Sequence, residues 1–171
     1  MKKIFAVLLA VVTACSLVSC NGRKYAELQI SNISGFGHNI INKTDFEDEL
    51  ADDSDLKHAA KLLSIELDLI NTTDGELEIF RSAAAMPPEE ITIIGARDAE
   101  SAKNIVNRAF TDRVRRLHSD FSDLDPEQLP KIKSSVKMAA GRYAFLIISN
   151  DNSAAKKALN DLLNTAIRIH E

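Results

Sequence analysis

The sequence predicts an α+β fold, a two-layer sandwich in which an antiparallel sheet carries helices on one face. Two observations lead to this prediction. A strand-strand-helix pattern occurs twice along the chain, and an amphipathic helical pattern precedes both copies. Strands joined by a short turn pair antiparallel, and the helix that follows covers the sheet they form. The 171 residues leave room for one such domain and little more.

The composition excludes several classes of protein. A hydrophobic content of 45% with 27% charged residues is that of a globular chain, which excludes general disorder and a polytopic membrane protein. Aromatic residues make up only 5% and Trp is absent, which argues against a stacking platform for sugars or single-stranded nucleic acid. The net charge is −4, so nucleic acid is a poor partner.

The first 19 residues read as a secretory leader. Met1–Lys3 is basic, Ile4–Val12 is apolar and uncharged, and small residues follow. This order of zones is typical of a cleaved leader. The apolar run falls short of the roughly 20 residues that span a bilayer, so a permanent transmembrane anchor is the weaker interpretation.

The leader ends in Leu17–Cys20, which resembles the bacterial lipobox. We therefore expect Cys20 to receive a diacylglycerol thioether, and often a further acyl chain such as palmitate on its amino group, at the extracytoplasmic face of the cell membrane. The alternative is ordinary cleavage near Ser16 or Ser19, which would release a soluble protein. Lipidation also leaves no free thiol, because Cys15 departs with the leader.

Residues 20–43 read as the lipidated Cys and a tether, and residues 44–171 as the single α+β domain. The tether is rich in Gly, Asn and Ser, including Ser34–Gly37, with a possible short strand at Ala26–Ile30. The apolar pair Ile40-Ile41 indicates that its far end packs down.

The domain begins with helical and turn signals. Thr44–Glu47 is a capping box, followed by a helical stripe that reaches Leu63 with a break near Asp52–Asp55. Alternation over Ile65–Leu69 indicates a strand or an extended crossing. Asn71–Gly75 has the residues of a turn.

The first module has strands at Leu77–Ala83 and Glu90–Ala96, joined by a turn at Met86–Pro88. Asp98 caps the helix that follows. One face of this helix is apolar at spacings of three and four, through Ala102, Ile105, Val106, Ala109, Phe110, Val114 and Leu117.

The second module follows a turn and short helix at Asp125–Glu127. Its strands are Ser134–Ala139 and Arg142–Ser149. The latter is apolar on both faces, so we expect it to be central and covered at least in part on both sides. Asp151 or Asn152 caps the closing helix.

Three stretches carry a family resemblance: Met86–Asp98, Asp125–Ile132 and Gly141–Ser149. They resemble a family of uncharacterised bacterial lipoproteins, a domain of unknown function found mostly in Gram-positive clostridia and their relatives. Where that family often carries an aromatic residue, this chain has Leu124. The resemblance implies the location and the fold, but no activity, cofactor or catalytic residue.

No pattern typical of a metal or cofactor site appears. The histidines are scattered, and no pair has a metal-ligand spacing. The acidic run Asp45–Asp55 lacks the Gly and terminal Glu of a helix-loop-helix calcium site, so a solvated helix face is the favoured interpretation. We predict no metal and no cofactor. The four histidines are His38, His58, His118 and His170.

A basic cluster in the first module's helix is a local exception to the acidic balance. It could face anionic lipid or a teichoic-type polymer. Compensation of the helix dipole in the last turns is the favoured alternative. Likewise, Glu89 and Glu90 could form an acid/base pair, but a polar turn that enters a strand is favoured. The cluster consists of Arg108, Arg113, Arg115, Arg116 and His118.

These patterns lead to one functional hypothesis and one rival. The leading hypothesis is a membrane-anchored extracytoplasmic lipoprotein that binds an envelope protein or polymer without catalysis, and no nucleic acid. The rival is an envelope hydrolase or modifying enzyme whose site combines distant residues, such as Glu90, Arg97 and His118. A pocket uniting acids with a His would favour the rival, and an exposed apolar patch would favour binding.

Overall fold

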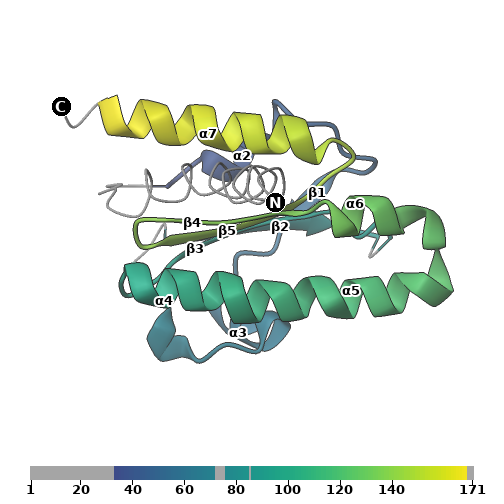
Figure 1. Ribbon diagram of the computed structural model, residues 1–171, viewed down its shortest axis with the longest axis horizontal. Helices are drawn as coiled ribbons and strands as arrows, with labels where there is room; N and C mark the ends of the chain where they lie inside the picture. The colour runs from purple at the N-terminus through teal and green to yellow at the C-terminus, as the bar shows by residue number, and fades with distance from the viewer. Residues whose placement is uncertain (1–32, 72–75, 85, 169–171) are drawn as a thin grey trace, which may run out of the picture.

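The computed structural model describes residues 33–71, 76–84 and 86–168. They form a five-stranded antiparallel sheet in the order β1-β2-β3-β5-β4 (Figure 1). The predicted α+β class and antiparallel sheet are confirmed. Because β3 and β5 are central neighbours, the two hairpins lie side by side in one sheet. The strands are β1 Leu50–Asp52, β2 Leu77–Ser82, β3 Glu90–Gly95, β4 Val136–Ala140 and β5 Tyr143–Ile148.

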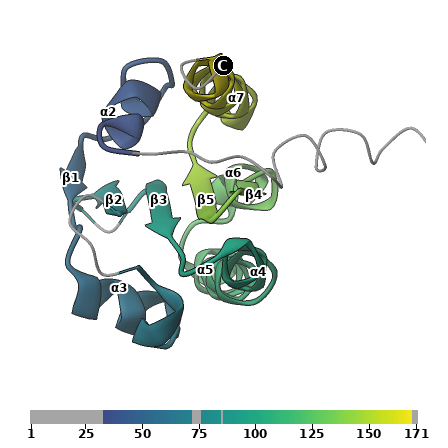
Figure 2. The same cartoon turned by 90° about the vertical axis from the view of Figure 1, so that its left-hand side faces the viewer.

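Helices cover both faces of this sheet, so the domain has three layers where two were predicted. Figure 2 shows α2 and α7 on one face and α3, α4 and α5 on the other. A π-helical segment, η2, joins α4 to α5 without a break, and α6 leads into β4. The helices are α2 Phe36–Ile41, α3 Leu56–Leu63, α4 Ala99–Asn104, η2 Ile105–Phe110, α5 Thr111–Leu124, α6 Leu129–Lys133 and α7 Asn152–Arg168, with 3₁₀ turns at Leu67–Leu69 and Pro126–Gln128.

The two central strands explain the third layer. Every residue of β3 and β5 is buried. Successive side chains of a strand point to opposite faces, so Ile91 and Ile93 join the core beneath α2 and α7, whereas Ile94 joins the core beneath α4 and α5. A sheet that is apolar on both faces needs cover on both. The expectation that the 142–149 strand is central and covered on both sides is confirmed.

The chain order places the two long helices on opposite faces. β3 and β4 run parallel, because each is antiparallel to β5, which lies between them. The segment from α4 to α6 therefore forms the crossover of a split βαβ unit on one face. The chain returns through the β4–β5 hairpin, and α7 then packs on the other face. The two modules thus share an element order but not an arrangement.

The helix predicted from Thr44 is absent. Residues 44–49 form bends, β1 follows, and α3 begins only at Leu56, where the Asp55 side chain accepts a hydrogen bond from the His58 backbone at 2.7 Å. The Thr44 hydroxyl is buried and has no hydrogen-bond partner within the described residues. Pairing of β1 with β2 has overridden the local capping pattern.

The strand predicted at Ile65–Leu69 is also wrong. A 3₁₀ turn occupies Leu67–Leu69, and only Ile70 makes a bridge, to Ala96. The turn predicted at Asn71–Gly75 lies mostly outside the described residues.

Residues 33–43, predicted to be the far end of a tether, pack with the domain, because Ile33 and Ile40 are fully buried in the core. The packing expected for Ile40 is confirmed. The backbone N–H groups of Gly35 and Gly37 donate to the two oxygens of Glu78, at 2.5 and 2.6 Å. A side chain on Gly37 would collide with the Phe80 ring. Glycine at position 37 therefore permits close packing against Phe80. The predicted Ala26–Ile30 strand lies outside the described residues.

The caps of the two long helical segments agree with the sequence patterns. Asp98 accepts from the Ser101 backbone at 2.7 Å, and this hydrogen bond lowers the pKa of Asp98. Asp151 accepts from the Ser153 and Ala154 backbones, so it caps α7. Across the described residues, none of the helices has the length and apolar character needed to cross a bilayer.

Candidate functional site

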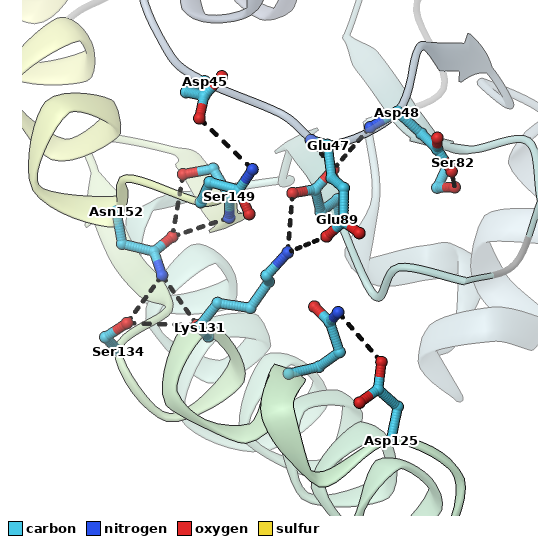
Figure 3. A network of polar contacts seen from close by, with 12 residues as sticks. Asp45, Glu47, Asp48, Ser82, Glu89, Asp125, Lys131, Ser134, Ser149 and Asn152 are labelled. Carbon is cyan, nitrogen blue, oxygen red and sulfur yellow. Dashed lines mark hydrogen bonds and ion pairs between the residues drawn. The ribbon is translucent and has the colours of Figure 1, made fainter.

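The three stretches that carry the family resemblance meet at one end of the sheet, where β3 begins and β5 ends (Figure 3). Glu89 precedes β3, Lys131 lies in α6, and Ser149 follows β5. Lys131 Nζ lies 3.1 Å from Glu89 Oε1 and 3.1 Å from Glu47 Oε2. The Glu89 side chain is 0% exposed and that of Lys131 12% exposed, so this ion pair is buried.

The second oxygen of Glu89 is satisfied as well. Glu89 Oε2 accepts from the Glu47 backbone at 2.8 Å and from the Asp48 backbone at 3.4 Å. A buried carboxylate is costly unless charges and donors surround it. Glu89 meets this requirement and also holds the segment before β1 against the sheet.

Asn152 links three further segments. Its Oδ1 accepts from the Ser149 backbone at 2.9 Å, and its Nδ2 donates to the Lys131 carbonyl at 2.8 Å and to Ser134 Oγ at 2.9 Å. The amide thus joins β5, α6 and the start of α7 (Figure 3). The sequence pattern indicates Asn152 only as a possible helix cap, and no local signal points to this link between segments.

Glu90, the next residue along the chain, points to the opposite face. Its Oε2 accepts from Arg113 Nη2 at 2.7 Å and from Nε at 3.0 Å, and Thr92 Oγ1 donates to its Oε1 at 3.3 Å. Strand geometry therefore separates Glu89 from Glu90 and gives each its own cation. The two glutamates do not form one acid/base pair.

The residues of the rival enzyme hypothesis do not converge. Glu90 and Arg97 flank opposite ends of β3, about 20 Å apart at the usual rise of a strand. The Arg97 side chain is mostly exposed, beside Asp98, whereas Glu90 is buried against Arg113. His118 lies on α5. The structure brings together Glu90 and Arg113 instead.

The predicted basic cluster is divided between the interior and the surface. Arg113 binds Glu90, and Arg116 donates to the Leu62 carbonyl at 2.7 Å. Arg115 is exposed and pairs with Asp112 at 3.0 Å. Because α5 continues to Leu124, these arginines do not occupy its last turn, and compensation of the helix dipole does not explain them.

The histidines and the acidic run have ordinary partners. The His38 ring packs against Phe80, and His58 Nδ1 lies 2.7 Å from Asp53. Asp53 also binds Arg81, at 3.0 Å. Residues 33–71, 76–84 and 86–168 contain no group of three acidic, His or Cys side chains placed to hold a metal ion. His170 and Cys20 lie outside the described residues.

A hollow of about 330 Å³, lined by both apolar and charged side chains, lies beside this end of the sheet. Its apolar part, which we call the Met86 patch, consists of the exposed Met86 and Leu124 and the buried Pro87, Pro88 and Leu117. Met86 and Leu124 are among the few large apolar side chains exposed in the described part of the chain. Leu124 is thus a surface residue.

Comparison with known proteins shows the family but not the activity. The chain matches no curated protein and no solved structure. Residues 42–149 match a family model described as a domain of unknown function, DUF4358. This match runs from the segment held by Glu89 to Ser149, so it includes the ion pairs of Glu89 and Glu90. The chain belongs to the DUF4358 family.

Proposed function

We propose that this protein is a membrane-anchored extracytoplasmic lipoprotein whose domain binds another envelope component without catalysing a reaction. The observation that carries the non-catalytic part is the pairing of the buried charges where the family's motifs meet. Glu89 and Glu90 each have a cation and further hydrogen bonds. A general acid or base must exchange a proton with a substrate, and these carboxylates are committed to holding segments together.

The anchor rests on Cys20 and the leader before it. A single acyl chain holds a protein only marginally on a bilayer, whereas two or more, at about 0.8 kcal/mol per buried CH₂, hold it stably. The diacylglycerol group alone supplies two. The tether then spans residues 20–32, because the domain core already includes Ile33.

The anchor is tested by Cys20→Ala with Cys15→Ala as a matched control. We expect Cys20→Ala to remain an uncleaved precursor and to lose metabolic fatty-acid labelling. Cys15→Ala should mature and label like the parent. An unmodified mature terminus, with the protein free in the culture medium, would contradict the anchor and support ordinary cleavage near Ser16 or Ser19.

The binding role is tested by purifying the detergent-solubilised protein after cross-linking in cells. We expect a defined envelope protein or polymer to be retained. Turnover of an envelope substrate that is lost in Glu90→Gln, with the fold intact, would support the rival enzyme instead.

A further inference from the structure

A hollow in the described part of the chain follows the outer edge of β4. It measures about 680 Å³. Residues 134–139 form one wall, and residues 150–153 with Lys156 and Asn160 of α7 form the other. The hollow is therefore a groove between a strand edge and a helix.

The backbone of β4 presents free hydrogen-bonding groups to this groove. Ala140 pairs with Tyr143 across a two-residue turn, so these two residues exchange both of their backbone hydrogen bonds. The pattern alternates along an antiparallel strand, so the N–H and C=O groups of Lys137 and Ala139 point away from β5. No strand of the described residues lies beyond β4.

The two edges of the sheet differ in how well they can accept another strand. β1 has three residues and includes Asp52, whereas β4 has five. A longer edge with unpaired backbone groups is a template for an added strand. The partly buried Met138 side chain gives the groove an apolar floor beneath α7.

The charges of the groove favour an acidic occupant. Lys137 and Lys156 are exposed on opposite faces of the sheet at this edge: Lys137 Nζ donates to Thr111 Oγ1 at the start of α5, at 3.5 Å, and Lys156 lies on α7. No ion pair involves either lysine within the described residues. Asp151, at the end of the groove, uses its Oδ1 for the backbone N–H groups of Ser153 and Ala154. In a chain of net charge −4, this edge of the sheet is therefore flanked by an exposed lysine on each face. Two copies paired along β4 would place the lysines of both copies beside one short seam, which disfavours self-pairing.

We propose that the outer edge of β4 binds an extended acidic segment of a protein partner as a sixth strand. Its backbone bonds to the outward groups of Lys137 and Ala139, and its carboxylates pair with Lys137 on one face of the sheet and with Lys156 on the other. This inference rests on the proposed function, because it names the class of partner for that binding module.

The charge requirement is tested with the detergent-solubilised protein and a fluorescent Glu-Val peptide in which pairs of Glu alternate with pairs of Val, so that both faces of the added strand carry carboxylates. We expect the Glu-Val peptide to bind, and a Lys-Val peptide of the same length not to bind. Lys156→Glu should weaken binding about tenfold. Lys157→Glu is the matched control: Lys157 pairs with Asp161 and does not line the groove, so less than about a twofold change is expected.

The backbone requirement is tested with Ala139→Pro. Proline has no backbone N–H and is tolerated at an edge position whose N–H points away from the sheet, so the β4–β5 hairpin should persist. The bound peptide would lose the Ala139 N–H as a hydrogen-bond donor. We expect binding to be lost with circular dichroism unchanged. In the parent protein, the Lys137 and Ala139 amides should exchange hydrogen quickly alone and slowly with the peptide.

Four results would overturn the inference. The first is failure of the parent to bind the Glu-Val peptide. The second is unchanged binding by both Lys156→Glu and Ala139→Pro. The third is protection of the Lys137 and Ala139 amides without peptide, which would mean that this chain or a second copy already covers the edge. The fourth is loss of binding in Leu124→Glu but not in Ala139→Pro, which would assign binding to the Met86 patch.

Failure of the inference and failure of the proposed function are distinguishable. If Cys20 is lipidated and a partner co-purifies equally well with Ala139→Pro, the β4 edge is excluded and the binding module stands. If the peptide binds at β4 but Cys20 carries no lipid, the anchor is excluded and the inference stands.

Discussion

The two ends of the central strands hold polar clusters of opposite character. The Glu89 cluster, at the start of β3, consists of Glu47, Glu89, Lys131, Ser149 and Asn152. The Glu76 cluster, at the end of β3, consists of Glu76, Arg142 and Tyr143. In it, Arg142 Nη2 lies 2.6 Å from Glu76 Oε1 and 2.9 Å from the Tyr143 hydroxyl.

The clusters differ in access to water and in completeness. The Lys131 side chain is 12% exposed against 31% for Arg142, and Glu89 is 0% exposed against 10% for Glu76. Both oxygens of Glu89 have partners, whereas Glu76 Oε2 is buried and accepts no hydrogen bond from any residue that the structure describes. The Glu89 cluster is closed and fully paired, and the Glu76 cluster is partly open.

This difference predicts where the domain tolerates change. A charge left alone in a closed site cannot recover its hydration, so removal of its partner is strongly destabilising. A charge near water recovers part of its hydration, so the same removal costs less. We therefore expect the Glu89 cluster to be much more sensitive than the Glu76 cluster.

Lys131→Met should have the largest effect. It leaves the Glu89 carboxylate buried without its cation, which we expect to lower the free energy of unfolding by about 3–5 kcal/mol. Urea denaturation near neutral pH measures the change. The double variant with Glu89→Gln should recover part of the loss, and Glu47→Gln alone should cost less than about 1 kcal/mol, because Glu47 is exposed. A loss below about 1 kcal/mol for Lys131→Met would remove the contrast between the clusters.

Gly95→Ala should have the next largest effect, at the other end of the strand. A Cβ at this position would collide with Glu76 Oε2 and lie 3.0 Å from Glu76 Cβ and 3.1 Å from the Glu76 carbonyl oxygen. Overpacking of this kind costs about 1–3 kcal/mol. Thermal unfolding measures the loss of stability. The additional change Glu76→Ala in the same chain should restore the part of the loss that is due to the Glu76 carboxylate. Equal losses of stability with and without Glu76→Ala would show that only the backbone of Glu76, and not its carboxylate, opposes a side chain at position 95.

Arg142→Gln should be milder than Lys131→Met, although it breaks a shorter ion pair. Arg142 is partly exposed, and its loss leaves Glu76 near water, so we expect about 1 kcal/mol. The same urea series measures both variants. A loss as large as that of Lys131→Met would show that Glu76 is closed off from solvent and that the two clusters are equivalent.

The sequence predicted the local elements around both clusters but not the clusters themselves. The 77–83 and 90–96 strands and the Asp98 cap depend on neighbouring residues, and they are confirmed. The capping box at Thr44 failed because β1 pairs with a strand far along the chain. Glu89 and Lys131 are 42 residues apart, and no local pattern pairs them.

The third layer was within reach of the sequence. Alternate residues of a strand face opposite sides of the sheet, and Glu90–Ala96 and Arg142–Ser149 have apolar residues in both alternating sets. Such strands require other elements to cover both faces of the sheet. The expectation of cover on both sides of the second strand was correct. The same expectation, applied to both strands, would have placed the two long helices on opposite faces of the sheet.

The smallest effect, and the most specific to the Glu76 cluster, concerns the ionisation of Tyr143. Burial raises the pKa of Tyr143 to about 12, and the charge of Glu76 adds to the rise while Arg142 opposes it. In the unfolded chain a Tyr titrates near pH 10. The neutral phenol therefore stabilises the fold below about pH 10, and this contribution is lost as the pH rises from about 10 towards about 12.

In Tyr25→Phe, Tyr143 is the sole tyrosine, so phenolate absorbance reports the ionisation of Tyr143 alone. Glu76→Gln should lower this pKa and Arg142→Gln should raise it, because the two side chains act on the phenolate with opposite signs. Titration of Tyr143 near pH 10 in the folded parent would mean that this end of the sheet is open to water, and the contrast between the clusters would then be larger than the structure indicates.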